Sequence, residues 1–191
     1  LSTISFHNLK KQLYEDNTIL LADLSELEAE KITRWFEVRH RMLMAAGKQV
    51  AEESLPSLVQ AQDSGQFAVT YFSKTNGLTR YSTPVEQNND YDPRTRPWYQ
   101  AAVQKDGAII TAPYEDASGL GTVVSLAVPV KASGRLQGVI AGDIAISRLI
   151  NDINAIQLPA NGYAMIVSQD GTVIAFNDES KILQPATRID D

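Results

Sequence analysis

Apolar residues recur every three or four positions along the first fifty residues of the chain. They stand at Leu20, Leu24, Leu27, Ile32, Trp35, Phe36, Leu43, Ala46 and Val50. Proline is absent before residue 54, and Gly47 is the one glycine in that stretch. This spacing predicts a helix, or two nearly continuous ones, that forms a spine over residues 1–55. We expect Pro56 and the polar stretch 60–65 to break the helical pattern.

After residue 65 the pattern changes to short apolar runs bounded by turn residues. Residues 67–72 and 78–81 have strand composition and flank a turn with Asn-Gly at its tip. Three further strands are expected at 108–112, 122–130 and 136–146, with helices from residue 96 or 97 to about 104 and at 147–156. The order predicts an α+β unit in which helices pack against one antiparallel sheet.

The same pattern starts again near the C-terminus. The segment that begins at Tyr163, with a polar turn at Gly171, repeats the segment that begins at Phe67 at an offset of about 95 residues. We therefore expect a first module over residues 56–150 and the start of a second, incomplete one over 151–191. Because the chain begins in helical sequence and ends within the second repeat, we expect it to be part of a longer protein.

Composition narrows the possible functions. The chain has 191 residues, of which 43% are hydrophobic, and a net charge of -6 without a basic run, which argues against nucleic-acid binding. It has no cysteine, and its two histidines, His7 and His40, lie on the expected spine helix, so no Ser-His or Cys-His pair can be assembled. An acidic pair of Asp116 and Asp143 would permit glycoside hydrolysis, but nothing else indicates a sugar-binding cleft. The chain contains no run of about 18 apolar residues, which is the length that a membrane-spanning helix needs.

One string concentrates binding chemistry. Residues 91–99 read Tyr-Asp-Pro-Arg-Thr-Arg-Pro-Trp-Tyr, which has no apolar periodicity and so predicts a rigid loop. Arginine offers a planar fork for a carboxylate, and the aromatic rings offer walls with a polar tip. Arg94 is expected to support the loop. For Arg96, contact with a ligand competes with a role in holding the loop to backbone carbonyls.

Two aspartates could supply the opposite charge. Asp143 lies in the apolar strand Val-Ile-Ala-Gly-Asp-Ile-Ala-Ile, where an unpaired charge is costly, so it needs a partner, either a ligand ammonium or an internal arginine. Asp116, in Tyr-Glu-Asp-Ala-Ser-Gly, is near a turn and could instead be an Asx-turn residue. Together these groups indicate a pocket for a small zwitterion.

A long N-terminal helix followed by tandem PAS-like modules resembles the double Cache (dCache_1) sensor domains of bacterial methyl-accepting chemotaxis receptors. The resemblance extends to the amino-acid-binding subgroup, whose pattern is a Tyr, Arg-x-Trp-Tyr, Tyr-x-Asp and a final Asp. The matching residues here are Tyr91, Arg96, Trp98, Tyr99, Tyr114, Asp116 and Asp143.

The resemblance implies an extracytoplasmic (periplasmic) domain that binds an L-amino acid in its membrane-distal module, with transmembrane helices outside this chain and no catalysis, metal or cofactor. Arg96 and Trp98 would then hold the ligand carboxylate. Tyr99, Asp116 and Asp143 would surround the ammonium, aided by Tyr91 and Tyr114.

Other interpretations remain open. The same fold could sense amines such as choline or polyamines through aromatic faces and carboxylates. It could also be the input domain of a sensor kinase or a cyclic-dinucleotide enzyme, or a docking surface for a periplasmic binding protein. We further expect a monomer or a weak homodimer that associates through the N-terminal helix.

Overall fold

The computed structural model describes residues 2–50, 55–86, 90–156, 162–168 and 170–189, with side chains described from residue 15 onward. The chain divides into two compact units, residues 1–38 and residues 39–191. The long helix α1 (Ser2–Val50) supplies the whole first unit and continues into the second. All the candidate site residues lie in the second unit.

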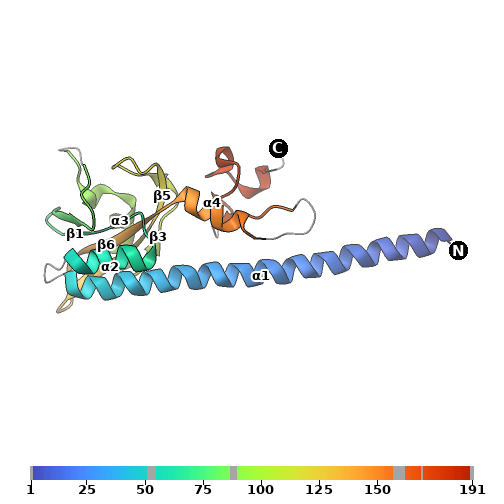
Figure 1. Ribbon diagram of the computed structural model, residues 1–191, viewed down its shortest axis with the longest axis horizontal. Coiled ribbons are helices and arrows are strands. Elements are labelled where there is room, and N and C mark those ends of the chain that lie inside the picture. Colours follow the sequence, from blue (N-terminus) through green and yellow to red (C-terminus); the bar gives the residue numbers. More distant parts are fainter. Residues whose placement is uncertain (1, 51–54, 87–89, 157–161, 169, 190–191) are drawn as a thin grey trace. The chain divides into compact units, whose positions relative to one another are not determined.

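A six-stranded antiparallel sheet forms the centre of the second unit (Figure 1). Its strand order is β2-β1-β6-β5-β3, and β4 pairs with β5 outside this path. The strands are β1 (Val69–Lys74), β2 (Thr79–Tyr81), β3 (Ile109–Ile110), β4 (Tyr114–Glu115), β5 (Thr122–Ala132) and β6 (Arg135–Ala145). The two longest strands, β5 and β6, form a hairpin whose turn contains Ser133 and Gly134, both with positive φ.

The two faces of this sheet pack against different helices. Val69, Tyr71, Ala127, Val139 and Ala141 share a core cluster with Trp98 and Ala102 of α3 (Pro97–Lys105). The alternate residues of the strands point to the opposite face, because successive side chains of a strand alternate. That face lies against α2 (Leu55–Gly65) and the end of α1, as Figure 1 shows.

Specific contacts attach these two helices to the sheet. Nε2 of His40 donates to the backbone oxygen of Ile109 at 2.9 Å, and burial lowers the pKa of His40. Gly47 allows close approach, because a Cβ there would lie 2.9 Å from the side chain of Val130. Thr70 Oγ1 donates to the backbone oxygen of Leu58 in α2 at 2.7 Å. These contacts attach α1 and α2 to the sheet on the face opposite α3.

Most of the expected elements are present, with one clear error. The prediction that Pro56 and residues 60–65 break the helical pattern is wrong, because they belong to α2. Pro56 lies in the first turn of that helix, where its missing N–H has no partner to lose. Residues 51–54, at the end of the expected spine, lie outside the described residues. The short strand β4 was not predicted.

The C-terminal region contains the expected hairpin. After α4 (Ile146–Asn154), strands β7 (Ile166–Val167) and β8 (Val173–Ala175) pair antiparallel, with Gly171 at positive φ between them. Two short 3-10 helices follow, η2 (Glu179–Lys181) and η3 (Ala186–Arg188). The α+β class, the long helix and the antiparallel sheets are thus confirmed. The module boundaries at residues 56–150 and 151–191 stay predictions.

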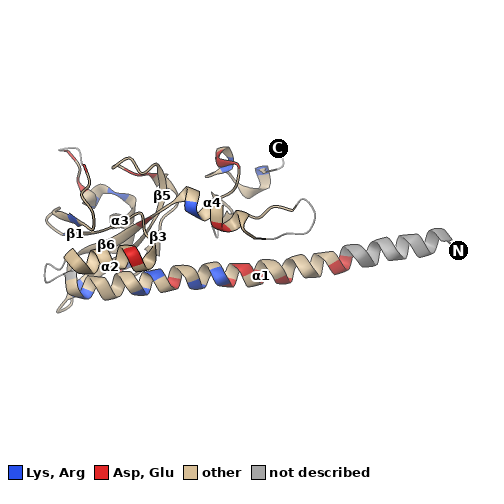
Figure 2. Cartoon of the chain, viewed as in Figure 1, with Lys and Arg blue, Asp and Glu red and all other residues tan. Residues whose placement is uncertain are grey.

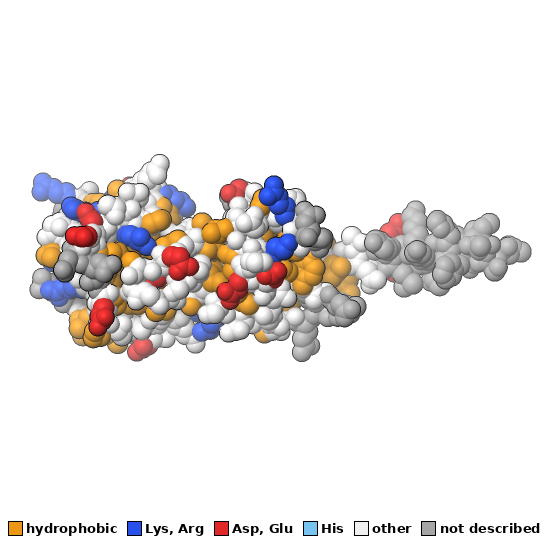
Figure 3. Space-filling view, turned by 90° about the horizontal axis from the view of Figure 1, so that it is seen from above, with side chains coloured by type: hydrophobic (Ala, Val, Ile, Leu, Met, Phe, Trp, Pro, Cys, Tyr) orange, Lys and Arg blue, Asp and Glu red, His pale blue; other side chains and the backbone are white. Residues whose placement is uncertain are grey.

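The distribution of charged residues is visible in two of the views (Figures 2 and 3). Along the described side chains of α1, acidic residues gather between Glu15 and Glu30 and basic residues between Lys31 and Lys48, with Glu37 among them (Figure 2). On the face shown in Figure 3, basic side chains are scattered among acidic and hydrophobic ones. Within the described part of the chain, no helix is both long enough and apolar enough to cross a membrane.

Candidate functional site

A small cavity opens on the α3 side of the sheet. It encloses about 300 Å³ of empty space, which includes solvent at its mouth. Six of the seven predicted site residues line it: Tyr91, Arg96, Trp98, Tyr114, Asp116 and Asp143. Residues that are far apart in sequence thus meet at one place, as the zwitterion hypothesis requires.

The loop that carries Tyr91 and Arg96 is stiffened by local capping. Asp92 caps the short 3-10 helix η1 (Pro93–Thr95) by accepting from the backbone N–H of Arg94 at 2.9 Å. Arg94 also turns its guanidinium back onto Asp92, with Nη2 to Oδ2 at 2.8 Å. Arg96 then caps α3, whose first residue is Pro97. A proline at the start of each helix fixes the backbone there, and the expected supporting role of Arg94 agrees with these contacts.

Arg96 combines a structural contact with unused donors. Its Nη2 donates to the backbone oxygen of Glu115 at 3.0 Å, and its guanidinium carbon lies 5.4 Å from the centroid of the Tyr114 ring. These contacts join the loop of residues 91–99, which we call the motif loop, to β4. The guanidinium makes no other hydrogen bond to the described residues, so it retains donors for a ligand.

Asp143 is the most unusual group of the site. Its exposed fraction is 1%, and no cation lies within ion-pair distance among the described residues. Its Oδ1 accepts from the Tyr71 hydroxyl at 2.8 Å and from Ser125 Oγ at 2.5 Å. Burial raises the pKa of Asp143 to about 7, although these two hydrogen bonds act in the opposite direction. An internal arginine partner, the alternative to a ligand, is therefore absent from the described structure.

Tyrosine hydroxyls surround this carboxylate. Tyr114 is hydrogen-bonded to Ser125 Oγ at 2.6 Å, and the hydroxyls of Tyr81 and Tyr91 are hydrogen-bonded to each other. Burial raises the pKa of each of these three tyrosines. They therefore remain neutral near pH 7 and can donate or accept hydrogen bonds.

Asp116 forms the turn that its sequence suggested, and it also reaches the cavity. Its Oδ2 accepts from the backbone N–H groups of Ser118 at 2.7 Å and Leu120 at 3.2 Å, and from the Ser118 hydroxyl. These bonds close the turn after β4, where Gly119 and Gly121 adopt positive φ. The Asx-turn interpretation is thus supported without excluding contact with a ligand, because Oδ1 is not used by the turn.

The two aromatic residues after Arg96 have different positions. Trp98 lines the cavity and packs edge-on to Tyr71, with ring centroids 4.9 Å apart. Tyr99 lies in the core cluster beside Trp98 and is not among the cavity-lining residues. Adjacent helical residues point about 100° apart, and the Trp98 and Tyr99 rings point in different directions accordingly. The ligand contact of Tyr99 stays a prediction.

Sequence reasoning missed several lining or supporting residues. Tyr71 and Tyr81 line the cavity from β1 and β2, and Ser125 supports Asp143 from β5. The motif does not contain them. The alternation of side chains along a strand indicates which face of the sheet these residues occupy. Their proximity to Asp143 depends in addition on the register between the strands. Val69, Ala117 and Ser118 complete the lining.

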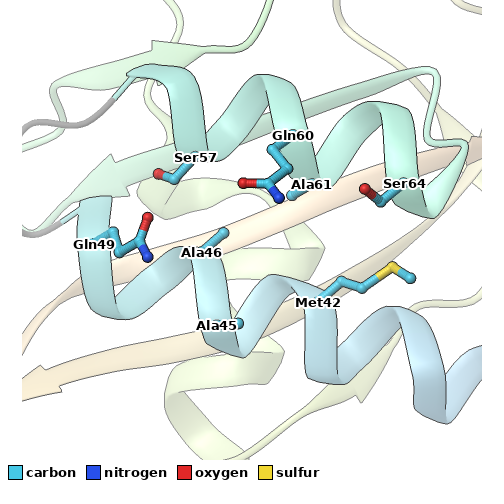
Figure 4. A pocket seen from close by; sticks show the side chains of 8 residues that line it. All are labelled: Met42, Ala45, Ala46, Gln49, Ser57, Gln60, Ala61 and Ser64. Atoms are coloured by element: carbon cyan, nitrogen blue, oxygen red, sulfur yellow. The ribbon is translucent and has the colours of Figure 1, made fainter.

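A second cavity, of about 530 Å³, lies between the end of α1 and α2 (Figure 4). Its lining residues are Met42, Ala45, Ala46, Gln49, Ser57, Gln60, Ala61 and Ser64. It is larger but contains no charged side chain to recognise a zwitterion. Among the described residues, no group of three or more His, Cys, Asp or Glu could hold a metal ion.

Comparison with known proteins identifies the family of the chain. The family model dCache_1, described as a Cache domain, matches residues 6–191. The chain is 35% identical over 171 residues to the methyl-accepting chemotaxis protein PscA of Pseudomonas syringae pv. tomato, which covers 86% of the chain and 27% of PscA. It is 27% identical over 180 residues to PctB of Pseudomonas aeruginosa, which covers 92% of the chain and 29% of PctB. The chain thus spans less than a third of the length of either relative.

Solved structures show the same fold. The ligand-binding domain of the Pseudomonas fluorescens chemoreceptor CtaA in complex with L-serine superposes with a TM-score of 0.81 at 27% identity, over 90% of this chain and 77% of that one. The ligand-binding domain of PctC of Pseudomonas aeruginosa, in complex with GABA, gives a TM-score of 0.80 at 29% identity, over 89% and 80% of the two chains. The chain belongs to the dCache_1 family, as a Cache ligand-binding domain of the kind found in methyl-accepting chemotaxis proteins.

Proposed function

We propose that this domain binds an L-amino acid in the cavity on the α3 side of the sheet and serves as the extracytoplasmic sensor of a chemotaxis receptor. The observation that carries the proposal is the buried carboxylate of Asp143, which has no ionic partner among the described residues and lines the same cavity as Arg96. A ligand that bears both charges would satisfy both groups. The family is one of sensors and not of enzymes.

At one end of the cavity, Arg96 would hold the ligand carboxylate. Its guanidinium has donors that no described residue uses, and its bond to Glu115 together with the Tyr114 ring fixes its position. Such preorganisation reduces the entropy lost when the carboxylate binds. Trp98, which is 1% exposed, would form the adjacent wall.

At the other end, Asp143 would accept the ligand ammonium. Asp116 would contribute the oxygen that its turn leaves unused, and the hydroxyls of Tyr91 and Tyr114 would complete the surroundings. Transfer of an ammonium from water is favourable only where charge and hydrogen bonds compensate the lost hydration. Two carboxylates and neutral hydroxyls meet that requirement.

An amine without a carboxylate is the second candidate. The cavity walls are largely aromatic and contain two acids against one arginine, which suits a cation. Two observations favour the zwitterion. Arg96 would stay without a counter-charge beside an amine, and the molecules bound in the similar structures, L-serine and GABA, each carry a carboxylate and an amine.

The relatives support a proposal for the rest of the receptor. Those named above are chemotaxis receptors, which favours that output over a kinase or a cyclic-dinucleotide enzyme. We place the domain in the periplasm, between transmembrane helices that lie outside this chain. A weak homodimer through α1 stays a prediction, for which the exposed Leu20, Leu21 and Leu27 supply apolar positions.

The direct test is a thermal-shift screen of the L-amino acids, choline and polyamines, followed by calorimetry of the best compounds. We expect at least one L-amino acid to raise the unfolding temperature and bind with micromolar affinity. Stabilisation by choline or polyamines alone would replace the amino-acid proposal with the amine one. Asp143→Asn serves as the matched control, because it removes the charge and keeps the shape.

A further inference from the structure

The register of the sheet places a row of three residues beneath the cavity. Val69 of β1 pairs directly with Asp143 of β6, and Asp143 pairs directly with Ser125 of β5. Cross-strand partners lie about 5 Å apart on the same face. Tyr71, two residues after Val69, is on the same face of β1 and reaches diagonally to Asp143. The carboxylate is thus held from both neighbouring strands.

The hydrogen-bond geometry fixes the direction of each bond when Asp143 is ionised. A carboxylate only accepts, so Tyr71 and Ser125 both donate, and both donate to Oδ1. A serine hydroxyl has a single hydrogen, so Ser125 must accept from Tyr114 in their 2.6 Å contact. The chain therefore runs from Tyr114 through Ser125 to Asp143. Oδ2 receives no hydrogen bond from any residue that the structure describes.

We propose that Tyr71 and Ser125 are positioning residues of the ligand site, whose hydroxyls hold Oδ1 of Asp143 so that Oδ2 meets the cationic group of the ligand. Tyr114 orients the Ser125 hydroxyl. The ligand part of this proposal rests on the proposed function, whereas the arrangement around Oδ1 exists without a ligand. No residue of this network other than Tyr114 and Asp143 belongs to the motif that the sequence displays.

The charge state of Asp143 reports on this network. The two donated bonds favour the ionised form, Asp116 disfavours it and Arg96 favours it, while burial is the largest effect and raises the pKa to about 7. The titratable and charged groups that face Asp143 are Tyr71 on β1, Tyr81 on β2, Tyr91 and Arg96 on the motif loop, Tyr114 on β4 and Asp116 after it. The tyrosines stay neutral, so the hydroxyl donors are the part of this environment that a conservative substitution can remove.

The test measures the protonation of Asp143 in the ligand-free domain. Carboxyl carbons of ¹³C-labelled aspartate are followed by NMR between pH 5 and 9, and Asp143→Asn assigns the signal. We expect Ser125→Ala and Tyr71→Phe each to raise the pKa of Asp143 by about one unit, because each removes a hydrogen bond to the charged form. Ser73→Ala is the control. It removes an equally buried hydroxyl of the same sheet, bonded to Thr79 at 2.6 Å, outside the cavity.

A second arm titrates L-serine into the same variants at pH 6.5, 7.5 and 8.5. The network predicts that Ser125→Ala and Tyr71→Phe weaken binding most at pH 6.5 and least at pH 8.5. A purely structural loosening would weaken binding equally at every pH. An unchanged Asp143 titration in both variants, or one also shifted in Ser73→Ala, overturns the network. A shifted titration without binding of any amino acid removes the proposed function and the ligand part of this inference, and leaves the arrangement around Oδ1 established.

Discussion

The motif loop carries two arginines in opposite electrostatic surroundings. Exposed Arg94 lies at what we call its outer end, and Arg96, which lines the cavity, lies at its inner end. At the outer end, Asp92 and Arg94 satisfy each other through several short bonds in contact with solvent. At the inner end, Arg96 keeps unused hydrogen-bond donors. The buried Asp143 of β6, which lines the same cavity, has only neutral hydroxyls as hydrogen-bond partners. A single residue, Thr95, separates these two arginines, and yet Arg94 supports the loop while Arg96 lines the cavity.

This difference shows how to separate a structural charge from a binding one. An exposed ion pair contributes little to stability and needs no ligand. A buried carboxylate without a counter-ion destabilises the empty domain, and such a group persists where function requires it. The string 91–99 contains the exposed pair of Asp92 and Arg94 and the cavity-lining Arg96 side by side, so the residue types alone do not distinguish their roles.

The largest expected effect follows removal of the inner arginine. Arg96→Ala should weaken binding of the best L-amino acid by about a hundredfold or more, because a two-point charge-assisted contact is lost. Calorimetry measures the change, and circular dichroism verifies the fold. An affinity within threefold of the wild type would assign Arg96 to loop support through Glu115.

The next effect concerns stability and its sign. The pKa of Asp143 in the folded state, about 7, lies above its ordinary value of 3.8, so ionisation disfavours the folded state. This penalty is absent below about pH 4, grows as the pH rises and is complete above about pH 7. Asp143→Asn should therefore stabilise the ligand-free domain by a few kcal/mol at pH 8 and by little at pH 4.

Thermal unfolding of wild type and Asp143→Asn at pH 4, 6 and 8 measures this difference. A variant less stable than the wild type at pH 8 would mean that Asp143 has a structural role. The same variant should also lose most of its affinity for an amino acid, so that stability and binding change in opposite directions.

A smaller effect is expected from pH itself. If binding of the ammonium requires ionised Asp143, affinity should be about tenfold weaker at pH 6 than at pH 8 and should level off above the pKa. Binding at pH 7 should release a fraction of a proton. Calorimetry in phosphate and Tris buffers, whose ionisation enthalpies differ, detects that proton. Identical heats in both buffers at pH 7 would contradict the coupling.

The smallest effect belongs to the outer end of the loop. Arg94→Ala should change affinity by about threefold or less, because an exposed pair with Asp92 contributes little. The same calorimetric titration, performed beside Arg96→Ala, makes the comparison within one loop. If the two variants lost affinity equally, the contrast between the two ends would be wrong.

Local pattern predicted much of this fold. Strands β1, β5 and β6 and helix α3 follow from apolar runs and turn residues. Helix α2 was missed because Pro56 was interpreted as a break, although the first turn of a helix accepts proline. Strand β4 was missed because two residues carry no periodicity, and its existence depends on pairing with β5.

The motif predicted several of the residues that line the cavity. Arg96, Trp98 and Asp143 line the cavity, whereas Tyr99 lies in the core, because helical geometry turns it away from its neighbour. The supporting residues Tyr71 and Ser125 could not be found from the string, because their contacts with Asp143 arise from the register of three strands.

The central claim is that the cavity binds both charges of one ligand, the carboxylate at Arg96 and the ammonium at Asp143. The most direct measurement is calorimetry of three compounds with wild-type protein: the best L-amino acid from the screen, its methyl ester and the amine that lacks its carboxylate. We expect both analogues to bind about a hundredfold more weakly, because each leaves Arg96 without its partner. An amine that binds as tightly as the amino acid would contradict the account.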